Sequence, residues 1–184
     1  MATKTATQIA LTAKDTDNRI VGNELNNLIT GNAFGIVING DFGNDTINGG
    51  SGDDEIYGDL GKDSINGGAG NDEIYGGDGR DTLTGGDGAD CFVFSGSDSL
   101  VRKPDTITDF NKSAGDTLNF GDLVLIVGQF NSSDPKTKIP TASLNQAVFD
   151  TAKSTLYVNT DNDSAFEFAV VLTGISDMNQ IATV

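Results

Sequence analysis

Residues 40–93 read GDFGNDTIN, GGSGDDEIY, GDLGKDSIN, GGAGNDEIY, GGDGRDTLT and GGDGADCFV, which are six consecutive blocks of nine residues without an insertion or a gap. Each block has glycine at its first and fourth positions, aspartate at its sixth and an apolar residue at its eighth. A fixed short period of this kind indicates a repeat architecture in which each unit stacks on its neighbours. The strict period therefore favours a folded solenoid over the flexible linker that a Gly/Asp-rich stretch usually forms.

Each block divides into a turn and a short strand. Glycine adopts the positive φ angles that tight turns need, whereas triplets such as Thr-Ile-Asn and Glu-Ile-Tyr suit a strand whose central side chain points inward. Two blocks then make one coil of 18 residues, and the apolar side chains stack as its interior. The predicted interior residues are Ile47, Ile56, Ile65, Ile74, Leu83 and Phe92.

The sixth-position aspartates predict a row of cation sites. Successive coils stack at about 4.8 Å, so each aspartate lies beside the one found 18 residues later. Calcium takes oxygen ligands at about 2.3 to 2.6 Å, so one ion fits between two layers, with turn carbonyls as the remaining ligands. Magnesium prefers a tighter octahedral shell and keeps its waters. The predicted pairs, which imply at least four calcium ions, are Asp45 with Asp63, Asp63 with Asp81, Asp54 with Asp72, and Asp72 with Asp90.

Composition supports bound cations and excludes other function classes. The chain has 184 residues, with 27 acidic and 11 basic side chains and a formal net charge of −16. This charge argues against nucleic acid or an anionic membrane as a partner. The chain has no histidine, so it lacks the usual zinc ligand and the commonest general base, and we expect no enzymatic activity. The single cysteine, Cys91, forms no internal disulfide, and we expect it to be an inert strand residue.

No targeting or spanning segment is evident in the sequence. The first residues, MATKTATQIALTAKD, contain no apolar core of a signal peptide. No apolar run approaches the roughly 20 residues that a membrane helix needs. We therefore expect no membrane-spanning segment, and export would require a signal of another kind.

The apolar spacing continues on the N-terminal side of the six blocks, through Ile38, Ile29, Ile20 and Leu11. The sixth position of these earlier blocks holds Asn18, Asn27 and Ile36 in place of aspartate. We therefore expect residues 1–39 to form coils of the same architecture that lack the metal.

The glycine rhythm stops after Val93. The chain then alternates strand-like segments such as TITDF and FEFAVVL with turn-rich stretches such as NSSDPKTKIP. A stack of repeats needs a cap, because its last coil otherwise exposes an apolar end and unpaired strand edges. The sequence thus predicts an all-β chain with metal-poor coils over residues 1–39, a calcium-binding roll over 40–93 and a β-rich cap over 94–184. The closing SDMNQIATV favours a short helix.

A weaker metal candidate lies at Asn159, Asp161 and Asp163, whose alternate oxygen ligands are similar to the start of a calcium loop. The glutamate that an EF-hand has at its twelfth position would fall at Val170, so the motif is not an EF-hand. A polar hairpin turn is the preferred interpretation, and a further ion is the alternative.

Taken together, residues 40–93 resemble the RTX (repeats-in-toxin, haemolysin-type) calcium-binding nonapeptides. Two later segments, GADCFVFSGSDS…PDTITDFNKSAGDTLNF (88–120) and TLYVNTDNDSAFEFAVVLTG (155–174), are similar to the C-terminal module of serralysin-type secreted proteases. The resemblance implies a parallel β-roll with two nonapeptides per coil and calcium in the turns. It also implies a secreted or cell-surface protein, exported by a type I (ABC-transporter) system that recognises an uncleaved C-terminal signal.

The resemblance also implies a ligand set. The carboxylate ligands would be Asp45, Asp54, Asp63, Asp72, Asp81 and Asp90, and the carbonyl ligands Gly43, Gly52, Gly61, Gly70, Gly79 and Gly88. The sequence departs from the proteases in two ways, because no catalytic domain precedes the repeats and the chain ends in QIATV. Neither protease activity nor the usual acidic-then-apolar terminal signal is therefore carried over.

Three functions are compatible with these features. The leading hypothesis is a secreted RTX protein whose folding is driven by calcium, with calcium ions and the type I secretion apparatus as partners. The second is a surface-layer, filament or adhesin component that assembles with itself or binds a cell-surface partner. The third is an accessory or targeting module of a larger secreted enzyme.

Overall fold

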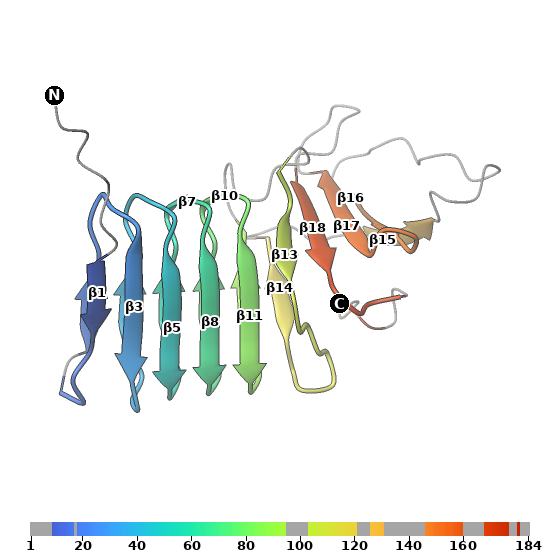
Figure 1. The fold of residues 1–184 in the computed structure, drawn as a ribbon. Coiled ribbons are helices and arrows are strands. Elements are labelled where there is room, and N and C mark those ends of the chain that lie inside the picture. The colour runs from blue at the N-terminus through green and yellow to red at the C-terminus, as the bar shows by residue number, and fades with distance from the viewer. Residues whose placement is uncertain are drawn as a thin grey trace, which may run out of the picture.

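The chain forms a flattened parallel β-solenoid that continues into a smaller group of strands at its C-terminal end (Figure 1). This computed structural model describes residues 9–16, 18–94, 103–120, 126–130, 146–159, 168–176 and 180. Within those ranges the regular structure is β-strand, and no α-helix and no helix able to cross a membrane is present. The all-β fold class predicted from the repeats is thus confirmed.

Two parallel sheets form opposite faces of the roll, because successive nine-residue blocks contribute strands to each sheet in turn. One face consists of β1 (Ile9–Thr12), β3 (Asn27–Asn32), β5 (Thr46–Ser51), β8 (Ser64–Ala69) and β11 (Thr82–Asp87). The other consists of β2 (Arg19–Val21), β4 (Val37–Asn39), β6 (Glu55–Tyr57), β9 (Glu73–Tyr75) and β12 (Cys91–Val93). The pairing is in register at 18 residues, with Ile29 beside Ile47 and Ile47 beside Ile65. The predicted coil of two blocks is confirmed.

The core of the roll is the column of eighth-position side chains. Ile38, Ile56 and Ile74 are completely buried, as are Leu83 and Phe92. The triplets of β4, β6 and β9 each have a buried central residue between two half-buried ones. Removal of this apolar surface from water, at roughly 25 cal/mol per Å², is the main stabilising contribution that the sheets provide.

The stack extends by one layer beyond the last nonapeptide. β13 (Asp105–Ile107) pairs in parallel with β11, and β14 (Thr117–Asn119) pairs in parallel with β12. The register is longer here, since Leu83 lies beside Ile107 and Phe92 beside Leu118. The sheets therefore continue across Val93, and the division at this residue into a roll and a separate cap stays a prediction. Two short strands, β7 (Leu60–Gly61) and β10 (Asp78–Gly79), pair within the turns of one edge.

Four further strands extend the first sheet. They are β15 (Ile126–Phe130), β16 (Gln146–Asp150), β17 (Thr155–Asn159) and β18 (Phe168–Leu172). β18 pairs in parallel with β13 and antiparallel with β17, so it covers the strand edge that the roll would otherwise leave open. Phe149, Val158 and Val170 are buried in this region and belong to the same core as the roll.

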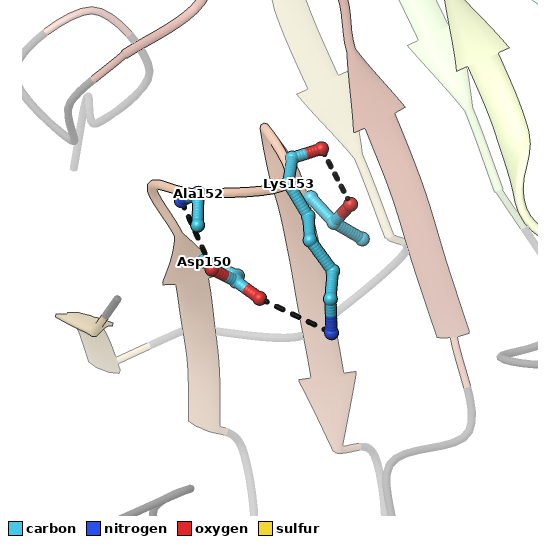
Figure 2. A network of polar contacts seen from close by, with 4 residues as sticks. Asp150, Ala152 and Lys153 are labelled. Carbon is cyan, nitrogen blue, oxygen red and sulfur yellow. Dashed lines mark hydrogen bonds and ion pairs between the residues drawn. The ribbon is translucent and has the colours of Figure 1, made fainter. Parts of the chain in front are cut away.

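The hairpin between β16 and β17 is closed by polar contacts (Figure 2). Asp150 is fully buried; its Oδ1 accepts the Ala152 N–H at 3.0 Å, and its Oδ2 lies 3.5 Å from Lys153 Nζ. The Thr155 hydroxyl donates to the Lys153 carbonyl at 3.0 Å. These contacts fix the turn and therefore the antiparallel register of β16 and β17.

Several predicted features fall wholly or partly outside the described residues. Asp161 and Asp163, of the weaker metal candidate, lie outside them, as does most of the C-terminal segment for which a short helix was expected. Cys91 lies on β12 as a half-buried free thiol.

Candidate metal centre

The sixth-position aspartates form two ladders, one along each turn edge of the roll. On one edge the Oδ1 of Asp63 accepts the Asp45 N–H at 2.7 Å, and the Oδ1 of Asp81 accepts the Asp63 N–H at 2.8 Å. On the other edge the Asp54 N–H donates to Asp72 at 2.9 Å, and the Asp72 N–H donates to Asp90 at 3.0 Å. The pairs predicted from the 18-residue spacing are therefore neighbours in the structure.

The second oxygen of these carboxylates is buried without a hydrogen bond. Among the described residues, this holds for the Oδ2 atoms of Asp45, Asp54, Asp63, Asp72 and Asp90. The side chains are 1 to 3% exposed, so water does not reach them freely. A buried carboxylate oxygen without a partner is costly, which makes these atoms candidates for binding a cation.

The first-position glycines leave space beside these oxygens. A β-carbon on Gly58 would lie 2.7 Å from Asp63 Oδ2 and 2.5 Å from the Gly76 carbonyl oxygen of the next layer. Gly40 has the same surroundings, with Asp45 Oδ2 at 2.5 Å and the Gly58 carbonyl at 2.7 Å. A carboxylate oxygen of one layer and a carbonyl oxygen of the next thus border a space that only glycine leaves open. An all-oxygen set of this kind fits calcium.

The fourth-position glycines lie next to the same carboxylates. A β-carbon would lie 3.3 Å from Asp63 Oδ1 if added to Gly61, and 2.9 Å from Asp81 Oδ1 if added to Gly79. On Gly61 it would also overlap the carbonyl oxygen of Gly43, one layer back. Five of the six predicted carbonyl donors have positive φ, namely Gly43, Gly52, Gly61, Gly70 and Gly88. Their role as ligands stays a prediction.

The electrostatics also favour a cation. Burial raises the pKa of Asp63 to about 8, against the smaller lowering effect of its hydrogen bond from Asp45, and the neighbouring carboxylates add to the rise. Burial likewise raises the pKa of Asp54 and of Asp72 to about 6. The pKa values of Asp45 and Asp90 are raised for the same main reason. No ion pair within the described residues involves any of these five carboxylates.

The donors of each predicted site would come from two layers. In the part of the chain that the structure describes, no three acidic, cysteine or histidine side chains meet at one point. A cation would therefore be held by the carboxylates of two stacked aspartates, such as Asp45 and Asp63, with backbone carbonyls completing its shell.

Two ladder residues were missed in the sequence. Asp105 Oδ1 accepts the Asp81 N–H at 2.7 Å, and Asp116 Oδ1 accepts the Asp90 N–H at 3.1 Å. Both lie outside the nine-residue register, because longer connections precede β13 and β14. A detectable signal exists in the tetrapeptides: DTIT at 105–108 matches DTLT at 81–84, and DTLN at 116–119 matches DTIN at 45–48.

The comparison with protein families settles what these turns are. The RTX calcium-binding nonapeptide repeat matches residues 37–65 and 57–90, in four copies. These residues are RTX repeats. RTX nonapeptides bind calcium, so the predicted cofactor is confirmed for residues 37–90, which contain the calcium-binding repeats. The similarity of residues 88–120 and 155–174 to the serralysin-type module stays a prediction.

Comparisons with whole proteins add little to this assignment. No curated protein matches the chain. Among solved structures, the solution structure of the AlgE6R3 subunit from the Azotobacter vinelandii mannuronan C5-epimerase is similar, with 24% identity over 83% of this chain and 78% of that chain and a TM-score of 0.38.

Proposed function

We propose that this RTX protein is secreted and that calcium drives its folding outside the cell. The observation that supports the proposal is the row of buried carboxylate oxygens without hydrogen-bond partners, repeated in successive layers. Bound ions would neutralise these oxygens and join each layer to the next. At least four ions are expected, one for each stacked pair from Asp45 to Asp81 and from Asp54 to Asp90.

The free energy available from the ions is sufficient for such a switch. An ion that binds only the folded chain contributes about 2.7 kcal/mol when its concentration is 100 times the dissociation constant. Four such ions would contribute on the order of 10 kcal/mol, which is comparable with the whole stability of a typical domain. Without ions, the buried carboxylates oppose folding, because each must either repel its neighbours or take up a proton.

Calcium-dependent folding suits export of an unfolded chain. Extracellular modules load with calcium at roughly 10⁻⁴ to 10⁻³ M, far above the cytosolic concentration. A type I exporter would carry the unfolded chain, and calcium would fold it on the outside. Folding would then oppose back-sliding through the exporter.

A structural role at the cell surface is the second candidate. Phe42 and Leu60 are 54% and 42% exposed and lie side by side on one turn edge. Adjacent exposed apolar side chains on a regular roll favour contact with a partner or a second copy. Light scattering with and without calcium tests this candidate, because assembly predicts particles larger than the monomer.

Calcium titration of chelator-treated protein tests the main proposal. Far-UV circular dichroism should show a cooperative gain of β structure with calcium at or below the millimolar range, and magnesium should not replace it. Equilibrium dialysis of the folded protein should give at least four ions per chain. A chain that is already folded in chelator and indifferent to calcium would contradict the proposal.

A further inference from the structure

The turn that precedes the first aspartate of one ladder is closed by an amide. Asn27 is fully buried and occupies the sixth position of the block that begins at Gly22. Its Oδ1 accepts the Asn23 N–H at 2.9 Å, and its Nδ2 donates to the Leu25 carbonyl oxygen at 2.6 Å. Both side-chain atoms are thus satisfied within the turn.

The orientation of this amide is determined by its partners. A backbone N–H only donates and a carbonyl only accepts, so oxygen must face Asn23 and nitrogen must face Leu25. In the aspartate turns the carbonyl of the fourth residue is a predicted metal ligand. In this turn the equivalent carbonyl, that of Leu25, instead accepts a hydrogen bond from the neutral Asn27 amide. By contrast, the Oδ2 of Asp63 in the corresponding turn has no hydrogen-bond partner among the described residues.

In the other ladder, the turn before the first aspartate has an apolar residue, Ile36, at its sixth position. Ile36 is 2% exposed, and a β-carbon added to Gly31 would lie 3.2 Å from its Cγ2. In the aspartate turns the Oδ2 atom occupies this place, as for Asp63 beside Gly58. A methyl group fills the space and has no affinity for a cation.

Both residues nevertheless continue the backbone ladder. The Asn27 N–H donates to Asp45 Oδ1 at 2.7 Å, and the Ile36 N–H donates to Asp54 Oδ1 at 2.9 Å. In each ladder the first carboxylate is therefore preceded by a turn whose sixth-position side chain is uncharged.

We infer that Asn27 and Ile36 end the two calcium ladders, because an amide satisfied within its own turn and a methyl group stand where the later turns have a carboxylate oxygen without a hydrogen-bond partner. The inference rests on the proposed function. It implies that the ladders start at Asp45 and Asp54, and that the turn at Asn27 closes without calcium. It also implies that a carboxylate at position 27, facing Asp45, would add a metal site.

Counting bound calcium in variants of the full chain tests this inference. Native mass spectrometry or equilibrium dialysis should give one ion more per chain for Asn27→Asp than for wild type. Asn27→Ala should bind as many ions as wild type but unfold at a lower urea concentration with calcium present, because Asn23 and Leu25 lose their partner. Asn48→Asp, the same change at an exposed strand position, should leave the count unchanged.

Two results would overturn the inference: an unchanged ion count in folded Asn27→Asp, or the loss of an ion in Asn27→Ala, which would make the asparagine a ligand. The second variant gives a result even if the first does not fold. A wild type that binds no calcium would refute the proposed function and this inference together. If the wild type binds calcium but either variant gives the overturning result named above, the inference is refuted and the proposed function stands.

Discussion

Replacement of Asp63 by asparagine should change stability in opposite directions with and without calcium. Asp63 lies in the middle of its ladder, with Asp45 on one side and Asp81 on the other, and is 2% exposed. Asparagine keeps the shape and an oxygen that can accept the Asp45 N–H, but it removes the charge. The two predicted calcium sites that share Asp63 would both be weakened.

The magnitudes follow from the ligand role and the pKa. With calcium at 100 times its dissociation constant, the loss of two ions would lower the free energy of unfolding by on the order of 5 kcal/mol. Without calcium, a carboxyl with a pKa of about 8 in the folded chain and about 3.9 in the unfolded chain takes up a proton on folding at pH 7. This uptake opposes folding by up to roughly 4 kcal/mol, and Asp63→Asn removes the penalty.

The two conditions require different assays. With calcium, urea unfolding should show a lower midpoint for Asp63→Asn, and dialysis should show up to two fewer ions. Without calcium, folding can be induced with trimethylamine N-oxide, which favours burial, and the variant should need less of it than wild type. Asp87→Asn, which removes the same charge from an exposed position at the end of β11, is the control. Destabilisation of Asp63→Asn in both conditions would refute the argument that its carboxylate opposes the metal-free fold.

Three further predictions follow from the turns and the core. Gly67→Ala should weaken calcium binding and lower stability by about 1 to 3 kcal/mol, because the added methyl would overlap Asp72 Oδ2 and lie 2.7 Å from the Gly85 carbonyl. Ser51→Ala is the control. Equal calcium midpoints for the two variants would contradict the assignment of the space beside Gly67 to a calcium ion. In buffer stripped of metal, acidification from pH 8 to 4 should increase β structure by circular dichroism. The raised pKa values of about 6 and 8 mean that carboxyl protonation stabilises the fold at low pH and that this stability is lost as the pH rises through them; a flat profile would refute this. Ile56→Ala should lower the free energy of unfolding of the calcium-loaded protein by about 2 to 5 kcal/mol, because the side chain is completely buried; a loss no larger than that of Val21→Ala, which is half exposed, would contradict the core assignment.

Most of the roll could be predicted because its interactions are local and periodic. The eighth-position residues, such as Ile56 and Ile74, form the core at a fixed spacing in the sequence. The alternation of side chains along each strand determines which of them face this core. The stacking of Asp45 on Asp63 follows from the period alone, since equal coil lengths place equivalent residues side by side. The two aspartate ladders could therefore be predicted from the sequence.

The tertiary structure alone showed that the ladders continue beyond Asp81 and Asp90. Asp105 and Asp116 join them through connections of unequal length, which no fixed period can reveal. The pairing of β18 with β13 is also nonlocal, because segments far apart in the chain meet only when the sheet forms. The amide of Asn27 could be recognised as closing its turn only from the hydrogen bonds to Asn23 and Leu25. Repetition thus determined the roll and its two aspartate ladders. The contacts at both ends of the roll could be found only in the folded chain, because their partners share no sequence period.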